Sequence, residues 1–409
     1  MRALAKLLEE IRPKRYRRGT HRLATPDETL ARVRPLATQM GITRLGNITG
    51  LDRIGIPVAI AVRPNSRSVS VSQGKGLDLQ QAMASALMEA CEGFHAEVIG
   101  PLCRVSYRDI AKGDTVVDPA TLCPGVRPFD PDAAIEWIEG YDLVRCEPCW
   151  VPGEIVHTDY ARSAPDGYFL AGSNGLASGN HLVEAVNAGL YELVERDALS
   201  LWLARPLRER VGHLLDLASV DDPDCAALIE KCAAARIAVR VWDITTNLGI
   251  AAFLCEIRDP AAGDPQMLRR FHGSGCHADS GVALSRALTE AAQTRLTYIA
   301  GVRDDLSPVE YRSTPGDDIR DALLDALARA AEPARFAAAP SLVADDLAAD
   351  LCWALGRLAA VGIERAVAID LTRPEFGIPV IRLVIPGLEW DPHHPNYRPG
   401  PRAQAVAAS

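Results

Sequence analysis

The feature that most constrains the fold of this chain is a unit that recurs along it: a cluster of glycines followed by a long, alanine-rich helical pattern. The first cluster, Gln73-Gly74-Lys75-Gly76, precedes a predicted helix from about Leu79 to Glu97, and the loop Gly172–Asn180 precedes another from His181 to about Leu203. A third helix is predicted over Val282–Ile299. Glycine permits close approach of two backbones, so we expect each cluster to be a strand-to-helix turn.

Strand-like segments alternate with these helices. Residues 318–361 show a helical pattern, and several β-branched or alternating segments are bounded by Gly and Pro, as is typical of strands. The alternation predicts an α/β or α+β fold, with two interleaved lobes rather than separable domains. The predicted strands are Thr43–Gly50, Pro57–Arg63, Ser68–Ser72, Arg365–Leu371 and Ile378–Ile385.

Composition and charge argue against several classes of protein. The 409 residues include 44 Lys and Arg against 53 Asp and Glu, a formal net charge of −9, which argues against a nucleic-acid partner. No uncharged apolar stretch reaches the length of about 18 residues that a membrane span requires, and charges interrupt the N-terminus before a signal sequence forms. The ten cysteines are dispersed, with one CxxC pair at Cys146 and Cys149. Reduced thiols in a cytoplasmic protein are the expected state.

The two ends of the chain differ from its centre. We expect residues 1–40 to form a basic arm and a helix that begins at Pro26 with Thr25 as its cap. Residues 41–390 are predicted to form the main domain. The segment 391–409 is rich in proline, which predicts an irregular tail.

Carboxylates lie on one face of each of the first two helices. Glu89 and Glu92 are about 60° apart on the first helix, and Glu184, Glu192 and Glu195 form a single stripe on the second. Asn180 precedes Glu184 by one turn and joins that stripe. An acidic helix face is often simply solvated. Like charges at this spacing repel one another, however, unless a cation or a basic partner offsets them.

The residue types around these stripes indicate the kind of ligand. Oxygen ligands without a matching set of His and Cys select a hard cation, and magnesium fits better than zinc. The side chains of Lys75, Arg196 and Arg295 are available for phosphate charge. The residues alone therefore predict a nucleotide site built around metals that carboxylates hold.

Four segments of the chain resemble the YcaO family. They are Ser68–Glu97, Ser173–Trp202, Gly281–Leu296 and Gly377–Glu389. The stretch RGTHRLATPDETLARVRP near the start is similar in particular to the YcaO branch encoded beside TfuA partner proteins. The resemblance implies a YcaO-type fold over residues 41–390 and a homodimer.

The resemblance also implies an ATP- and Mg²⁺-dependent enzyme that modifies a peptide or protein backbone. In this family a nucleophile adds to an amide carbon, the amide oxygen takes the γ-phosphoryl group of ATP, and phosphate then leaves. A Cys, Ser or Thr side chain as nucleophile gives an azoline ring, whereas external sulfide gives a thioamide. A TfuA-like protein is the expected partner, since the residues before the core are too few for a domain that binds a leader peptide.

Carried over position by position, the resemblance assigns three sets of site residues. The expected magnesium ligands are Glu89, Glu92, Glu184, Glu192 and Glu195. The expected nucleotide and phosphate contacts are Arg22, Thr29, Ser72, Lys75, Asn180, Arg196 and Arg286. The residues assigned to the catalytic step are Glu195, Arg196, Gln293 and Arg295.

One departure from the family bears on the product. Azoline-forming members commonly end in a Pro-x-Pro-x-Pro motif, which this chain lacks, although it has Pro395, Pro399 and Pro401 near its end. Thioamide formation is therefore the leading expectation and cyclodehydration the nearest alternative. A non-catalytic ATP-binding scaffold is the alternative from another class. A sulfur relay through Cys91 is disfavoured, because Cys91 points away from Glu89 and Glu92 and packing is its expected role.

Overall fold

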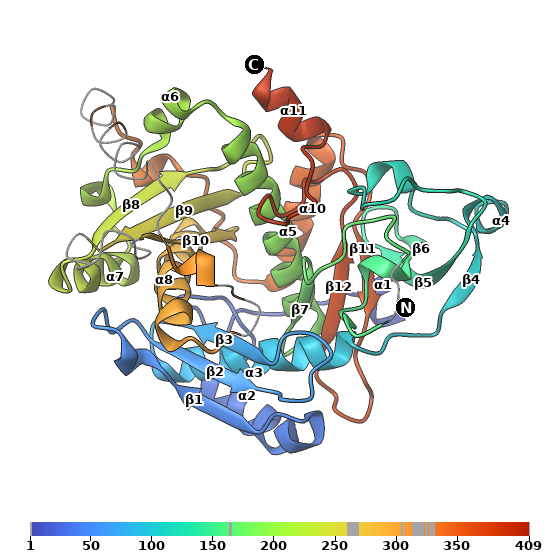
Figure 1. The fold of residues 1–409 in the computed structure, drawn as a ribbon, viewed down its shortest axis with the longest axis horizontal. Coiled ribbons are helices and arrows are strands. Elements are labelled where there is room, and N and C mark those ends of the chain that lie inside the picture. Colours follow the sequence, from blue (N-terminus) through green and yellow to red (C-terminus); the bar gives the residue numbers. More distant parts are fainter. Residues whose placement is uncertain are drawn as a thin grey trace.

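The computed structural model describes residues 2–162, 166–259, 270–303, 306, 308–312, 323, 326 and 332–408. It has a mixed α/β fold, as predicted, in which long helices pack against antiparallel sheets (Figure 1). Three sheets are formed by the described residues. We call them the N-terminal sheet, the middle sheet and the large sheet.

The N-terminal sheet is a three-stranded meander with one long helix on it. Its strands, in the order β1-β2-β3, are Arg44–Asn47, Val58–Val62 and Val71–Lys75. Helix α3, Leu79–Ala96, begins after the capping residue Asp78 and packs on β2 and β3. The predicted helix and two of the predicted strands are confirmed here, whereas the third strand lies later than Ser68–Ser72.

The middle sheet repeats this arrangement with a later part of the chain. Its strands β8, β9 and β10 are Ala238–Asp243, Ala251–Arg258 and Arg270–His277, in the order β10-β9-β8. Helix α8, Ser280–Ala300, is capped by Asp279 and packs on β10 and β9, with α7 (Pro223–Ala234) beside it. The predicted third helix is thereby confirmed.

The large sheet has six strands, with β7 at one edge. They are β4 Cys103–Ser106, β5 Ala134–Asp142, β6 Glu147–Pro152, β7 Leu176–Ser178, β11 Val367–Asp370 and β12 Val380–Val384. The predicted closing strands are β11 and β12, which pair with each other. Helix α5, Leu182–Ala204, contacts β12, β7 and β10 and therefore joins the large sheet to the middle sheet (Figure 1).

Shorter helices complete the chain. Helix α10, Leu347–Ala360, packs on α5 and confirms the last part of the helical pattern predicted over 318–361. The prediction is wrong for residues 332–346, which contain only a short 3-10 turn at Phe336–Ala338, and residues 318–331 fall mostly outside the described residues. The others are α1 Arg2–Ala5, α2 Pro26–Val33, α4 Tyr107–Ile110, α6 Leu207–Arg210 and α11 Pro401–Ala407.

The segments at the two ends are more ordered than the sequence indicated. Helix α2 begins as predicted, with Thr25 and Glu28 forming a reciprocal capping box. The prediction of an irregular tail is wrong for Pro401–Ala407, which form α11. This helix is held to α5 because the Arg402 guanidinium lies 2.8 Å from the buried carboxylate of Asp197.

Glycines set the distance between strands and helices both in the turns, at Gly76 before α3 and Gly179 before α5, and within the strands themselves. Gln73, Gly74 and Lys75 belong to β3, so the prediction that they form a turn is wrong. A Cβ atom on Gly74 would lie 2.0 Å from the backbone nitrogen of Ala86 on α3. At Gly275 of β10 it would lie 2.2 Å from the carbonyl oxygen of Ala283 on α8. These glycines therefore let each helix lie directly on its strand.

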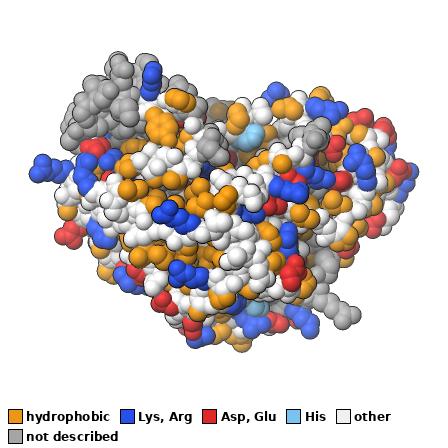
Figure 2. Space-filling model, turned by 60° about the horizontal axis from the view of Figure 1, so that its bottom comes forward, with side chains coloured by type: hydrophobic (Ala, Val, Ile, Leu, Met, Phe, Trp, Pro, Cys, Tyr) orange, Lys and Arg blue, Asp and Glu red, His pale blue; other side chains and the backbone are white. Residues whose placement is uncertain are grey.

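The surface and the thiols bear on the expectations from composition. All ten cysteines are free, and Cys91 is buried, as expected for a packing role. Among the described residues, no helix is both long enough and apolar enough to cross a membrane. Figure 2 shows one face of the molecule, on which basic and acidic side chains are interspersed rather than separated by sign.

Candidate functional site

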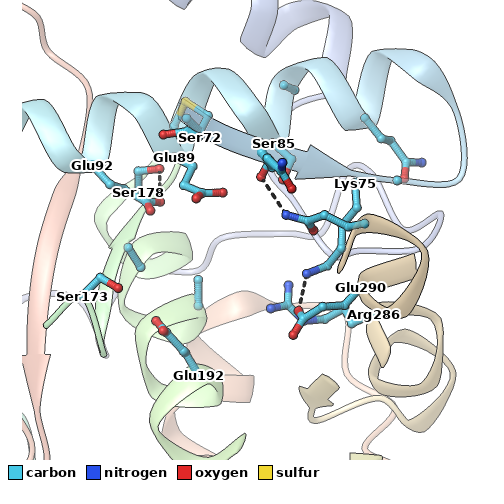
Figure 3. A pocket seen from close by; sticks show the side chains of 18 of the residues that line it. Ser72, Lys75, Ser85, Glu89, Glu92, Ser173, Ser178, Glu192, Arg286 and Glu290 are labelled. Atoms are coloured by element: carbon cyan, nitrogen blue, oxygen red, sulfur yellow. Dashed lines mark hydrogen bonds and ion pairs between the residues drawn. The ribbon is translucent and has the colours of Figure 1, made fainter. Parts of the chain in front are cut away.

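A cavity of about 850 Å³ lies where the three long helices meet. Helices α3, α5 and α8 line it together with strand β3 and the N-terminal arm (Figure 3). All but one of the residues that the sequence assigned to the site line this cavity. They are Arg22, Thr29, Ser72, Lys75, Glu89, Glu92, Asn180, Glu184, Glu192, Glu195, Arg196, Arg286 and Gln293.

Helix α3 supplies two carboxylates, Glu89 and Glu92, that form no ion pair with any cation among the described residues. Glu92 accepts a 2.7 Å hydrogen bond from the Ser178 hydroxyl, and Glu89 accepts one from the backbone N–H of Gln73. Burial raises the pKa of Glu89 to about 7 and that of Glu92 to about 8, and other glutamates of the cavity add to both shifts. These groups are therefore held in surroundings that disfavour their negative charge.

Helix α5 contributes the opposite wall. Glu192 accepts a hydrogen bond of 3.2 Å from Gly175 N–H, and burial raises its pKa. One oxygen of the buried Glu195 accepts a 2.7 Å bond from the Ser274 hydroxyl, while Oε2 has no hydrogen-bond partner among the described residues. Burial disfavours the charge of Arg196, but Glu195, 3.9 Å away, and Glu192 raise its pKa above the usual value.

Glu184 has a different environment from the other carboxylates of α5. It accepts hydrogen bonds from the backbone N–H groups of Leu23 and Asn180 and from the Asn180 side chain. The Thr29 hydroxyl in turn donates to Asn180 Oδ1 over 3.0 Å. Glu184 thus fastens the N-terminal arm against α5, and its oxygens are largely engaged in doing so.

Helix α8 and the end of β3 bring two cations, a carboxylate and an amide to the cavity. Lys75 of β3 forms an ion pair with Glu290, and Arg286 lies one turn before Glu290 on the same face (Figure 3). Burial favours the neutral form of Glu290, but Lys75 and Arg196 outweigh it and hold its pKa below the usual value. The side-chain amide of Gln293 donates to the carbonyl oxygen of Gln73 over 3.2 Å.

Arg295, which the sequence assigned to phosphate or substrate, is the exception. It does not line the cavity but is buried on another side of α8, where it contacts Asp52 at 3.0 Å and Asp259 at 3.2 Å. Two positions along a helix correspond to about 200°, so Arg295 cannot share the direction of Gln293. Its role is to hold α8 to its neighbours.

The donor set fits magnesium better than any transition metal. Among the described residues, no three His, Cys, Asp or Glu side chains are close enough to form a metal cluster by themselves. The cavity instead presents single carboxylates from two helices, with an unpartnered buried oxygen on Glu195. Magnesium commonly takes one or two carboxylates and completes its shell with water and phosphate oxygens. Glu89, Glu92, Glu192 and Glu195 are therefore suited to hold it.

Two features of the cavity escaped the sequence analysis. Glu290 is the partner of Lys75, and it lies four residues after Arg286 and three before Gln293. That spacing places all three on one helix face and was sufficient to find it. Ser178, the partner of Glu92, comes from a different part of the chain, and no local pattern connects the two.

Comparison with known proteins agrees with this geometry. The sequence model of a family described as YcaO cyclodehydratase, ATP- and Mg²⁺-binding, matches residues 73–389. The chain belongs to the YcaO family. ATP and Mg²⁺ are accordingly its cofactors.

Relatives of this YcaO chain cover most of its length. A protein of Rhizobium leguminosarum bv. trifolii, named as an uncharacterized protein in the tfuA 3′ region, is 37% identical over 386 residues, which are 90% of this chain and 89% of that protein. An uncharacterized protein of Methanothermobacter thermautotrophicus is 35% identical over 372 residues, 89% of this chain and 94% of that protein.

Solved structures show the same fold. A heterocyclase in complex with substrate and cofactor superimposes with a TM-score of 0.77 at 26% identity, covering 93% of this chain and 54% of the heterocyclase. YcaO from Methanopyrus kandleri, bound with AMPPCP and Mg²⁺, gives a TM-score of 0.71 at 24% identity, covering 93% of this chain and 95% of that one. The N-terminal segment before residue 73 therefore has counterparts in known structures.

Proposed function

We propose that this YcaO chain uses ATP and Mg²⁺ to phosphorylate the oxygen of a peptide or protein backbone amide, and that an external sulfur source then converts the amide to a thioamide. The observation that carries the proposal is the distribution of charge in one cavity. Carboxylates of α3 and α5 line one space together with the cations Arg196 of α5 and Arg286 of α8, and that space is large enough for a nucleotide and a peptide.

The residues of the cavity have distinct roles in this proposal. Glu89, Glu92, Glu192 and Glu195 hold magnesium, with Glu184 fixing the arm beside them. Magnesium neutralises the charge of the triphosphate. Arg22, Thr29, Ser72, Lys75, Asn180 and Arg286 bind the nucleotide.

Two residues are placed next to the reacting groups. Arg196 stabilises negative charge on the phosphoryl group that is transferred, since Glu195 and Glu192 keep its guanidinium charged in a buried position. Gln293 orients the amide, because its own side chain is fixed on Gln73.

One observation favours the thioamide over the azoline. The relative from Rhizobium is named for a position beside tfuA. A TfuA-like partner that delivers sulfur or substrate is part of the proposal, as is a homodimer. The likeness to a heterocyclase favours cyclodehydration as the second candidate.

Intact mass decides between the two products. Exchange of oxygen for sulfur adds about 16 Da to a peptide, whereas dehydration removes about 18 Da. The purified chain is incubated with MgATP, sulfide, a TfuA-like protein and candidate peptides containing cysteine. A gain of mass that requires sulfide supports the proposal, and a loss of mass without sulfide transfers the assignment to cyclodehydration.

A matched set of variants tests the site itself. Glu192→Gln and Glu195→Gln are expected to lower peptide-dependent phosphate release at least 100-fold, because each removes a charge from the metal set. Glu230→Gln on α7, outside the cavity, serves as the control and should retain activity. Nucleotide binding without phosphate release under any of these conditions would indicate a scaffold rather than an enzyme.

A further inference from the structure

The outer edge of strand β3 opens into the cavity. Among the strands that the structure describes, β3 pairs with β2 alone, so its other edge has no neighbouring strand there. Arg63 N–H donates to Ser70 over 2.7 Å, and Gly76 N–H donates to Pro57 over 3.3 Å. Within β3 the even-numbered residues therefore direct their backbone N–H and C=O groups towards β2, and the odd-numbered residues direct theirs away from it. Val69 lies just before the strand.

The outward-facing groups fall into two sets. At Gln73 they are already used, because its N–H donates to Glu89 and its carbonyl oxygen accepts from Gln293. At Val69 and Val71 the backbone groups have no hydrogen-bond partner among the described residues. Both valines line the cavity, and the Val69 residue is 38% exposed. The part of the edge with unpaired backbone groups thus ends next to Gln73, whose backbone groups contact Glu89 and Gln293.

The side chains around the free edge differ from those around the carboxylates. Tyr160 is 55% exposed and lies close to the two valines, because its backbone N–H donates to the carbonyl oxygen of Arg67 over 3.1 Å, and Tyr298 and Leu306 line the same cavity. An apolar and aromatic mouth beside unpaired backbone groups suits an extended peptide, which an open strand edge binds through main-chain hydrogen bonds. A nucleotide could not pair with such an edge, because a nucleotide has no repeating row of hydrogen-bond donors and acceptors.

We propose that β3 binds the peptide substrate as an added strand along Val69–Val71, which directs the amide to be modified towards Glu89 and Gln293. This inference rests on the proposed function for the identity of the ligand as a peptide. Recognition through the main chain makes binding at this edge tolerant of the peptide's side chains, so that selectivity has to come from elsewhere, such as a partner protein.

The probe is an acetylated and amidated hexapeptide of alternating Thr and Val, whose binding is measured by calorimetry in the presence of MgATP. Val71→Pro removes the outward N–H and places a ring where the peptide would lie, but leaves the ladder to β2 intact. It is expected to weaken peptide binding at least tenfold. The matched variant Val71→Ala keeps the N–H and should stay within about threefold of the original affinity. Affinity for MgATP should be unchanged in both.

Equal peptide affinity of the two variants, or no binding of the hexapeptide to the unmodified chain at millimolar concentration, would overturn the inference. If Val71→Pro loses MgATP affinity through misfolding, N-methylation of the hexapeptide at successive positions decides with the unmodified chain. Loss of affinity at alternate positions supports strand addition, and equal loss at every position contradicts it. Peptide binding is measured without turnover. A positive binding result would therefore stand even if the proposed chemistry failed, and a negative binding result would leave the proposed chemistry untouched.

Discussion

The α3 unit, formed by β1–β3 and α3, and the α8 unit, formed by β8–β10 and α8, have one architecture and opposite roles in the cavity. In each, a meander of three strands is followed by a helix that lies on the last strand. Gly74, Asp78 and Glu89 have the same spacing in the chain as Gly275, Asp279 and Glu290. The glycine sets the contact, the aspartate caps the helix, and the glutamate faces the cavity in both units.

The difference between the units lies in what surrounds the equivalent glutamates. In the part of the chain that the structure describes, no cation forms an ion pair with Glu89, and burial raises its pKa to about 7. Glu290 is paired with Lys75, and its pKa is lowered. Arg286 of α8 takes the position that Ser85 has on α3, and Gln293 takes that of Glu92. The same architecture therefore gives the cavity an acidic side at α3 and, at α8, a side on which acidic and basic groups offset each other. This distribution of charge suits a polyanion bound together with metal ions.

The largest expected effect is a loss of stability when the close contact between helix and strand in either unit is disrupted. Gly74→Ala and Gly275→Ala each place a Cβ atom at about 2 Å from helix backbone and should destabilise the fold by about 5 kcal/mol or more. Gly50→Ala has open space around its Cβ and is the control. Chemical denaturation measures all three. A small effect at either glycine would show that its helix shifts freely on its strand.

The next prediction separates the two arginines of the α8 unit. Arg295→Met takes a guanidinium away from the buried carboxylates of Asp52 and Asp259, although Arg53 still contacts Asp259 at 2.9 Å, and should cost about 3 kcal/mol in free energy of unfolding. Arg286→Met should cost less than about 1 kcal/mol but weaken binding of MgATP about tenfold. Denaturation and calorimetry together check the pair. Reversal of the two outcomes would return Arg295 to the site.

The equivalent glutamates are expected to act on stability with opposite sign when nucleotide and metal are absent. The folded-state pKa of Glu89 is raised, so its contribution falls as pH rises from about 4.5 to about 7, by at most about 1.4 kcal/mol per pH unit. Glu89→Gln should therefore stabilise the chain at pH 8. The pKa of Glu290 is lowered, so its contribution is present at pH 8 and lost as pH falls through its folded-state pKa.

Glu290→Gln should accordingly destabilise the chain at pH 8 by about 1–2 kcal/mol, since it also leaves Lys75 unpaired. Unfolding by urea at pH 5 and pH 8 measures both variants. Changes of the same sign at pH 8 would mean that the two sides of the cavity are electrostatically alike.

The smallest effect tests whether the caps are equivalent. Asp78 accepts from Gln81 N–H over 2.9 Å, and Asp279 accepts from Val282 N–H over 3.0 Å. Asp78→Ala and Asp279→Ala should each cost about 1 kcal/mol of stability. Unequal losses, measured by thermal denaturation, would locate the less rigid of the two helices.

The sequence was informative wherever one helix carried the whole signal. The spacing of Glu192 and Glu195 on α5, and of Glu89 and Glu92 on α3, predicted that each pair faces one direction, and both pairs line the cavity. The sequence pattern was misleading where the position of a side chain depends on partners from distant parts of the chain. Arg295 was expected at the site because it is a cation on the third helix, in a segment that resembles the family, although helical geometry directs it elsewhere.

The sequence by itself determined the mixed fold, the three long helices and which carboxylates share a helix face, because periodicity, capping residues and glycines act over a few neighbouring positions. Only the tertiary structure decided that Glu89 lacks a cation while Glu290 has Lys75, and that the edge of β3 stays open at Val69 and Val71. Charges and strand edges are satisfied by partners far away in the chain. No short-range pattern in the sequence shows which distant residue will be the partner of a given charge or strand edge.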